Sequence, residues 1–271
     1  MVAPAEGGAD GLVQVIILDI DGCLNAGVHA PYDLDAIAAL RDFNAAARAS
    51  PVHPRLTLCS GRPQPYVAAM AQFLHLDLPA LCEHGGLLFS ARDDHVILHP
   101  MLGPELRDQL RDVRQALDAA LGDRFQLAYE AGKETRLTIF PRGATTAGEI
   151  GDRAQAAIDA LGLPLQVRRQ PACINVHPRG LHKGVGVRWL ADTIGVPLAA
   201  CAGFGDTEDD VPFLELVARR GAPRNAEAAV RAVPECMVGV RDAIDAALAF
   251  CERMRDRNRA LLAGHPKDAV S

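Results

Sequence analysis

Short apolar runs that end in polar turns alternate with amphipathic segments at the start of the chain. Residues 13–18, VQVIIL, end at DIDG, and residues 56–59, LTLC, end at SGRP. An apolar run bounded by a turn indicates a strand that is buried on both faces, as in parallel sheets. Residues 34–47 lie between the two runs and carry apolar side chains at helical spacing. The pattern therefore predicts a β-α-β unit.

The same alternation continues further along the chain. A helix at 64–74 and a short strand with a glycine turn in PALCEHGG follow. A helix at 183–194, the run LAACAGF and the turn GDTEDD resume the pattern later, with weaker strands in LVARRGAP and ECMVGV. Strands that alternate with helices predict a doubly wound, parallel, Rossmann-like α/β sheet.

The middle of the chain follows another pattern, in which strands come in adjacent pairs. A helix near 105–121, the strands FQLAYE and RLTIFPR, a helix near 147–161 and the strands LQVRRQ and ACINVHPRG give the approximate order αββαββ, with HVILHP before them. This order predicts an antiparallel sheet with helices on one face, inserted into the core as an α+β cap domain.

The change of pattern sets the expected domain boundaries. We expect a core domain at 13–86 and 181–250, a cap domain at 87–180, and flexible termini at 1–12 and 263–271.

Composition excludes several classes of protein. The chain has 271 residues, 49% of them hydrophobic and 23% charged, which is typical of globular proteins. Its net charge of -6 and the lack of a Lys/Arg block argue against nucleic acid or a membrane surface as partner. The seven cysteines include no CxxC pair, so neither a disulfide framework nor a zinc cage is indicated. No signal peptide or membrane span is apparent, and we expect a cytoplasmic protein; the oligomeric state is left open.

Acidic and hydroxyl side chains follow three of the predicted strands: Asp19 and Asp21; Ser60, before Gly61; and Asp206, Asp209 and Asp210. Ligands of open α/β sheets bind at the carboxyl ends of the strands. Carboxylates brought together there would repel one another unless a hard cation lay between them, and Mg²⁺ is the natural choice. DxDG alone is weak evidence, because surface turns also produce it. An EF-hand is excluded, because Gly22 is at the fourth position of the loop and Ala30 at the twelfth.

Four segments in order carry a family resemblance: VIILDIDGCL, TLCSGRP, GLHKGVGVRWL and GFGDTEDD. Together they resemble the motifs of the haloacid dehalogenase superfamily of phosphotransfer enzymes, over residues 13–86 and 181 to about 245. The αββαββ insertion resembles the type IIB cap of that superfamily. The layout is most similar to sugar-phosphate, mannosylphosphoglycerate and archaeal-type phosphoglycolate phosphatases, and less so to phosphomannomutases.

The resemblance implies a role for each motif residue. Asp19 would be the nucleophile that forms an aspartyl-phosphate, and Asp21 the acid/base. The phosphoryl oxygens would be held by Ser60, Gly61 and Lys183. Mg²⁺ would be held by Asp19, Asp21 through its backbone carbonyl, Asp206 and, directly or indirectly, Asp210.

Two positions depart from the family pattern, and the role of one histidine is undecided. Cys23 stands where the family usually has threonine, and Asp209 where it usually has asparagine. His84, in EHGG, faces the site or is a turn histidine bonded to the backbone. A zinc site from His177 and His182 is disfavoured, because no carboxylate is paired with them at ligand spacing.

Substrate contacts are expected from the rim and the cap: Arg62 after the second motif, Lys133 and Arg136 in YEAGKETR, and Asn175 in INVHPRG. The competing interpretation is that Lys133 and Arg136 are solvated charges on a surface hairpin and contact no substrate.

The resulting hypothesis is a Mg²⁺-dependent phosphomonoesterase for a small anionic phosphorylated metabolite. A phosphomutase on the same fold is the alternative. A receiver-like signalling module and a non-catalytic binding protein are less favoured, because receivers are shorter and lack a cap, and because every position that the chemistry needs is filled here.

Overall fold

The computed structural model describes residues 11–121, 127–142, 146–170 and 172–264. Five parallel strands form the central sheet, in the order β12-β11-β10-β1-β2. The strands are β1 (Val15–Leu18), β2 (Arg55–Leu58), β10 (Cys201–Phe204), β11 (Arg219–Ala222) and β12 (Met237–Val238). Strand β1 lies inside the sheet, between β10 and β2, and this position explains its apolar run, since interior parallel strands are covered on both faces.

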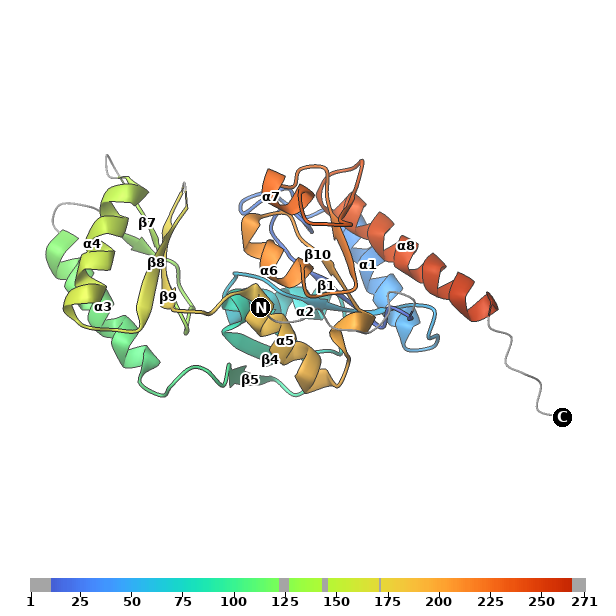
Figure 1. The fold of residues 1–271 in the computed structure, drawn as a ribbon, viewed down its shortest axis with the longest axis horizontal. Coiled ribbons are helices and arrows are strands. Elements are labelled where there is room, and N and C mark those ends of the chain that lie inside the picture. Colours follow the sequence, from blue (N-terminus) through green and yellow to red (C-terminus); the bar gives the residue numbers. More distant parts are fainter. Residues whose placement is uncertain (1–10, 122–126, 143–145, 171, 265–271) are drawn as a thin grey trace.

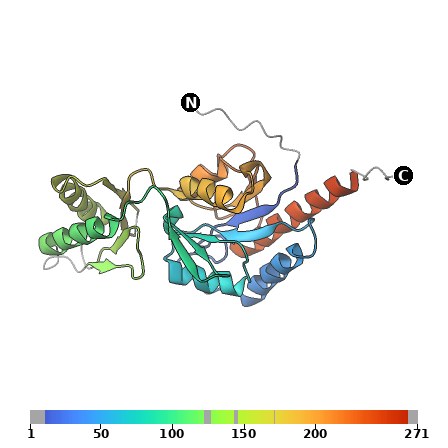
Figure 2. The same cartoon turned by 90° about the horizontal axis from the view of Figure 1, so that it is seen from below.

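Helices cover both faces of this sheet (Figures 1 and 2). One face packs against α1 (Leu34–Ala47), α2 (Gln64–Phe73) and α8 (Ala243–Gly264), and the other against α5 (Lys183–Ile194), α6 (Val211–Leu214) and α7 (Ala228–Arg231). Along β1, Ile16 and Leu18 belong to the first apolar cluster and Val15 and Ile17 to the second. The alternation of side chains along a strand thus produces two cores, and the doubly wound prediction is confirmed.

A second, antiparallel sheet extends the core at the edge beside β2. It contains β3 (Ala80–Cys82), β4 (Leu87–Ser90) and β5 (His95–Leu98), and a bridge between Cys59 and Leu81 joins it to the end of β2. Residues 87–98 were expected in the cap. Instead, β4 pairs with β3 and β5 pairs with β4, because the side chains of β4 insert into the two core clusters.

The cap follows with the predicted αββαββ order. Its elements are α3 (Leu106–Leu121), β6 (Ala128–Tyr129), β7 (Leu137–Phe140), α4 (Ala147–Ala160), β8 (Leu165–Arg169) and β9 (Ile174–Pro178). The antiparallel sheet runs β6-β7-β9-β8, and both helices cover the face turned away from the core (Figure 1). Ile139, Ile174 and Val176 point into this helix-covered face. Their strand neighbours therefore point toward the core.

Helix α8 was not predicted, and it continues through Gly264, so residues 263–264 of the expected flexible terminus are helical. Within α8, the buried Asn258 accepts a hydrogen bond from the Val13 amide and donates one to the Val13 carbonyl. Residues 1–10 and 265–271 of the expected termini lie outside the described residues. None of the helices in the described part of the chain is both long and apolar enough to cross a membrane.

Candidate active site

The ends of β10, β1 and β2 bring the three predicted acidic and hydroxyl segments together. Leu18 is in register with both Phe204 and Leu58, and the Asp19 amide donates to the Phe204 carbonyl at 2.9 Å. Asp19 is 5% exposed and Asp206 8%. Adjacent parallel strands end at one edge, so residues far apart in sequence share this edge as predicted.

Lys183 begins α5 and reaches into the acidic group. Its Nζ lies 2.8 Å from Asp19 Oδ1 and 2.5 Å from Asp210 Oδ1. Burial alone would lower the pKa of Lys183, but the carboxylates of Asp19 and Asp210 outweigh it and raise that pKa well above its ordinary value. The site therefore holds a buried ammonium beside the proposed nucleophile.

Asp210 was expected as a direct or indirect metal ligand. One of its oxygens binds Lys183, and the other accepts from the Asp206 amide at 2.9 Å, the Thr207 amide at 2.9 Å and the Thr207 hydroxyl. Asp210 lies in the short helical turn η3 (Glu208–Asp210). Its contacts fix the loop that carries Asp206, which favours the indirect role.

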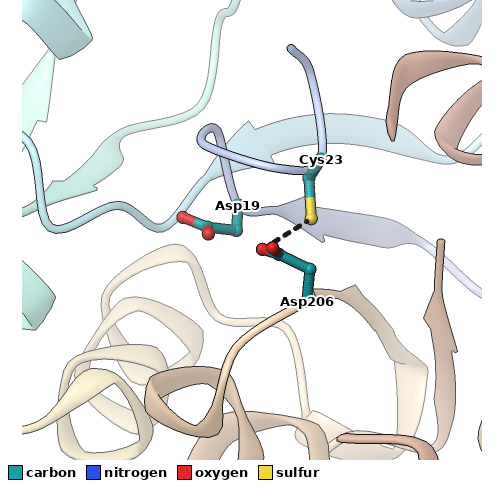
Figure 3. Close-up of side chains that lie close together, drawn as sticks. All are labelled: Asp19, Cys23 and Asp206. Atoms are coloured by element: carbon teal, nitrogen blue, oxygen red, sulfur yellow. Dashed lines mark hydrogen bonds between the residues drawn. The ribbon is translucent and has the colours of Figure 1, made fainter. Parts of the chain in front are cut away.

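Asp206, Asp19 and Cys23 form a compact group of donor atoms (Figure 3). One ligand atom from each lies within 4.8 Å of the others. Burial and then the charge of Asp210 raise the pKa of Asp206 to about 7, and burial also raises the pKa of Asp19. Among the described residues, no Lys, Arg or His forms an ion pair with Asp206. The buried carboxylates of Asp19 and Asp206 have only one lysine, Lys183, against them in the described residues. A divalent cation such as Mg²⁺ between them would balance the remaining negative charge.

The turn that follows Asp19 requires glycine. Gly22 has a φ of 85°, and a Cβ there would lie 2.0 Å from Asp206 Oδ2. Asp21, one residue earlier, turns its carboxylate to Arg62, with Nε 2.6 Å from Oδ2 and Nη2 2.8 Å from Oδ1. Arg62 was expected at the substrate rim; the structure pairs it with the predicted acid/base.

The Ser60–Gly61 turn lies against His84, which is part of the turn η1 (Glu83–Gly85). Ser60 is 1% exposed, and a Cβ on Gly61 would lie 2.2 Å from the His84 ring. Burial and then Arg136 lower the pKa of His84 well below its usual range, so the ring is neutral. The ring thus lies between the Ser60–Gly61 turn and Asp209, 3.3 Å from the latter, which favours the interpretation that His84 faces the site.

Polar side chains cover the core-facing side of the cap sheet. Lys133 Nζ lies 2.7 Å from Glu130 Oε2 and 2.6 Å from Thr138 Oγ1. The Thr138 hydroxyl donates to Asn175 Oδ1 at 2.6 Å, and Asn175 is 3% exposed. Lys133 and Asn175 thus belong to one buried network, and the solvated-hairpin interpretation does not hold for Lys133.

Arg136 is 3% exposed, although it carries a guanidinium. No ion pair joins it to any described residue, and its Nε has no hydrogen-bond partner there. Burial lowers the pKa of Arg136 to about 10, and it stays cationic at neutral pH. A buried cation that lacks a direct partner is costly, so this position favours an anionic ligand.

Comparisons with known proteins agree with this geometry. A family model described as haloacid dehalogenase-like hydrolase matches residues 151–248, which include Lys183, Asp206 and Asp210. A crystal structure of a haloacid dehalogenase-like hydrolase from Bacteroides thetaiotaomicron superposes with a TM-score of 0.69, at 16% identity, over 89% of this chain and 99% of that chain. Residues 151–248 are thus similar to that family, and the chain shares the fold of one of its members. The predicted resemblance to the haloacid dehalogenase superfamily is confirmed.

Two relatives named as phosphoglycolate phosphatases match different shares of this chain. A phosphoglycolate phosphatase of Natronomonas pharaonis is 24% identical over 251 residues, which are 90% of this chain and 99% of that protein. A phosphoglycolate phosphatase of Methanothrix thermoacetophila is 30% identical over 80 residues, and this match covers 30% of this chain and only 36% of that protein.

The departure from the superfamily pattern at Asp209 has a structural explanation. Arg168 Nη1 lies 2.5 Å and Gln170 Nε2 3.2 Å from the Asp209 carboxylate, and both come from the cap. His84 Nε2 lies 3.3 Å from it. Burial opposes ionisation, but the His84 hydrogen bond and the Arg168 charge hold the pKa of Asp209 below its usual range. Asp209 therefore joins the cap to the core, and its partners Arg168 and Gln170 were missed in the sequence.

Glu83 is a second residue that sequence reasoning missed. It is fully buried, and its carboxylate accepts hydrogen bonds from the Glu134 amide at 2.9 Å and from the Thr135 amide and hydroxyl at 2.8 Å each. The sequence feature that could have indicated it is an acidic residue in the EHGG turn, beside the predicted site. Glu83 anchors the cap hairpin that carries Lys133 and Arg136.

His177 belongs to the cap. Its Nδ1 lies 3.1 Å from the Pro178 carbonyl and its Nε2 3.5 Å from Gln166 Nε2. Burial lowers the pKa of His177 to about 4. No group of possible metal ligands in the described residues includes His177 or His182.

Proposed function

We propose that this protein is a Mg²⁺-dependent phosphomonoesterase that acts on a small phosphorylated metabolite through an aspartyl-phosphate at Asp19. The observation that carries the proposal is the pairing of the buried Asp19 carboxylate with Lys183 Nζ at 2.8 Å, at the carboxyl end of β1. The relatives named as phosphoglycolate phosphatases support the same reaction class.

The first half of the reaction transfers the phosphoryl group to the protein. A carboxylate oxygen of Asp19 attacks phosphorus, and the bond from phosphorus to the ester oxygen breaks. Asp21 gives its proton to that leaving oxygen. Lys183, the Ser60 hydroxyl and the Gly61 amide hold the phosphoryl oxygens, whose charge is the main target of catalysis in phosphoryl transfer.

The second half releases phosphate. Asp21, now ionised, takes a proton from water, which attacks the aspartyl-phosphate and regenerates Asp19. Asp19, Asp206 and the backbone carbonyl of Asp21 would hold Mg²⁺, which supplies positive charge against the phosphoryl oxygens when bound. The cap covers the site and excludes bulk water.

The substrate's leaving group is read by the cap. Lys133, Arg136 and Asn175 line its core-facing side, and Arg136 has no ion pair of its own in the described residues. A leaving group with a carboxylate, as in phosphoglycolate or phosphoglycerate, would supply the missing anion. A sugar phosphate, whose leaving group is uncharged, would leave Arg136 without an anionic partner.

A phosphomutase is the second candidate, and the same cationic residues favour it. A mutase must hold a second phosphate at the cap, which Arg136 and Lys133 could also bind. Addition of a catalytic amount of the sugar bisphosphate separates the two. A mutase requires it, and a hydrolase releases inorganic phosphate without it.

The decisive experiment is a screen of phosphorylated metabolites on the purified protein, with inorganic phosphate as readout and with EDTA as control. We expect turnover that EDTA abolishes and that is highest for esters whose leaving group carries a carboxylate. Undiminished turnover in EDTA would remove the metal from the proposal, and absence of turnover on every ester would refute it.

A further inference from the structure

Cys23 lies inside the acidic group at the end of β1 (Figure 3). It is fully buried, and hydrogen bonds from the Cys23 and Leu24 amides to the Ile20 carbonyl, at 3.1 and 2.7 Å, fix the turn that presents it. The thiol is therefore held in place by the backbone and does not depend on packing alone.

The Cys23 sulfur approaches the atoms expected to hold the metal. Sγ lies 3.5 Å from Asp206 Oδ1, and the Asp19 carboxylate completes a set of three donor atoms within 4.8 Å of one another. A sulfur at about 2.3 Å and an oxygen at about 2.0 Å from one tetrahedral zinc ion are separated by roughly 3.5 Å. The observed spacing is that of a hydrogen bond from the Cys23 thiol to Asp206, and it equals the spacing that two ligands of one ion would need.

Asp206 provides the second observation. It is 8% exposed, and the Cys23 thiol is its single side-chain partner within the described ranges. The carboxylate therefore points at the same small volume as the thiol, without a cationic side chain against it. A buried carboxylate of this kind is costly unless a cation binds to it.

We propose that Cys23 is itself a metal ligand and gives this site a higher affinity for thiophilic divalent ions, such as Zn²⁺ and Co²⁺, than for Mg²⁺. The inference rests on the proposed function in placing the metal between Asp19 and Asp206. Thiolate sulfur binds zinc and cobalt strongly and magnesium poorly, because Mg²⁺ prefers hard oxygen ligands.

Coordination replaces the S–H bond of Cys23 by a sulfur–metal bond, and the proton passes to the buffer. A threonine, which the superfamily usually has here, offers a hydroxyl that keeps its proton and is a weak ligand. The site thus gains one soft ligand and keeps its carboxylates. Zn²⁺ then competes with Mg²⁺ for the same place.

The test is a Co²⁺ titration of the purified metal-free protein, followed by absorption. A thiolate bound to Co²⁺ gives a ligand-to-metal charge-transfer band in the near ultraviolet. We expect this band to saturate at one equivalent, to vanish in Cys23→Ser, and to persist in the control Cys236→Ser, whose thiol is half-buried and outside the site. Competition with a chromophoric chelator should show Zn²⁺ affinity at least about tenfold weaker in Cys23→Ser, with Mg²⁺ affinity changed less than about threefold.

Two outcomes would overturn the inference: no charge-transfer band at saturating Co²⁺, or a band that survives in Cys23→Ser. Either would leave the phosphatase proposal intact if Mg²⁺ still supported turnover. Conversely, a Cys23-dependent band in a protein that hydrolyses no phosphate ester would support the ligand and refute the proposed function.

Discussion

Arg62 binds both carboxylate oxygens of Asp21, through Nε at 2.6 Å and Nη2 at 2.8 Å. The guanidinium is itself held, because it lies 4.5 Å from the centre of the Tyr66 ring and donates to the Val28 carbonyl at 2.7 Å. A two-point pair of this kind fixes the orientation of a carboxylate as well as its position. Arg62 therefore positions the proposed acid/base.

We predict that Arg62→Met lowers kcat most for esters with poor leaving groups. Those esters need a proton from Asp21 as the bond to phosphorus breaks, whereas a nitrophenolate leaves without one. The expected losses are about 10- to 100-fold for an alkyl phosphate and less than about fivefold for p-nitrophenyl phosphate. Equal losses on both esters would show that Arg62 acts on folding or closure.

We predict that Glu83→Gln loosens the anchor of the cap hairpin. The amide keeps the shape but loses the charge that three hydrogen bonds share. A hydrogen bond to a charged group contributes about 1.5–3 kcal/mol, so the free energy of unfolding in urea should fall by that order. Thr135→Val is the matched control, because it removes the hydroxyl contact alone and should cost less. A Glu83→Gln protein as stable as the wild type would contradict the anchor.

We predict that stabilisation by Mg²⁺ depends on pH through Asp206. Its pKa of about 7 means that a proton occupies the carboxylate below neutrality and that Mg²⁺ must displace it. Each pH unit below 7 should weaken apparent Mg²⁺ affinity about tenfold. The shift of Tm on adding Mg²⁺ should therefore be large at pH 8 and small at pH 5.5.

The difference between Tm with and without Mg²⁺ cancels the titration of groups that do not contact the metal. In Asp206→Asn the Mg²⁺ shift should be small at both pH values. A Mg²⁺ shift that is the same at pH 5.5 and pH 8 in the wild type would contradict the raised pKa of Asp206.

We predict that Arg136→Met separates substrates by their leaving group. The methionine fills the buried space without the charge, so an ester with a carboxylate loses a partner that an aryl phosphate never had. The loss in kcat/KM should be about 10- to 100-fold for phosphoglycolate, that is ~1–3 kcal/mol, and slight for p-nitrophenyl phosphate. Arg111→Met, on the exposed side of α3, is the matched control. Similar losses on both esters would place Arg136 in folding.

Local patterns predicted the elements that place the core site. Residues such as Asp19 and Lys183 stand where an apolar run ends or an amphipathic helix begins, and such features need only neighbouring residues to be recognised. The same reasoning placed residues 87–98 in the cap, because an apolar hairpin has no local feature that tells which sheet it joins.

Contacts between distant segments could not be predicted in this way. In the sequence, Glu83 looks like any acidic residue in a turn. Its burial depends on Thr135, which is 52 residues away. The role of Asp209 likewise depends on a distant residue, because it pairs with Arg168 on the facing cap strand. A charge that pairs across domains has no periodicity, so the three-dimensional arrangement is needed to see it.

The central claim is that Asp19 is the nucleophile, and trapping the intermediate tests it most directly. Wild-type protein mixed with its best substrate and quenched in acid within one turnover should yield one phosphoryl group on the peptide that contains Asp19, identified by mass spectrometry. Asp19→Asn should yield none, stay folded and lose nearly all turnover. A phosphoryl group on another residue, or an Asp19→Asn protein that keeps more than about a tenth of the wild-type rate, would contradict the account.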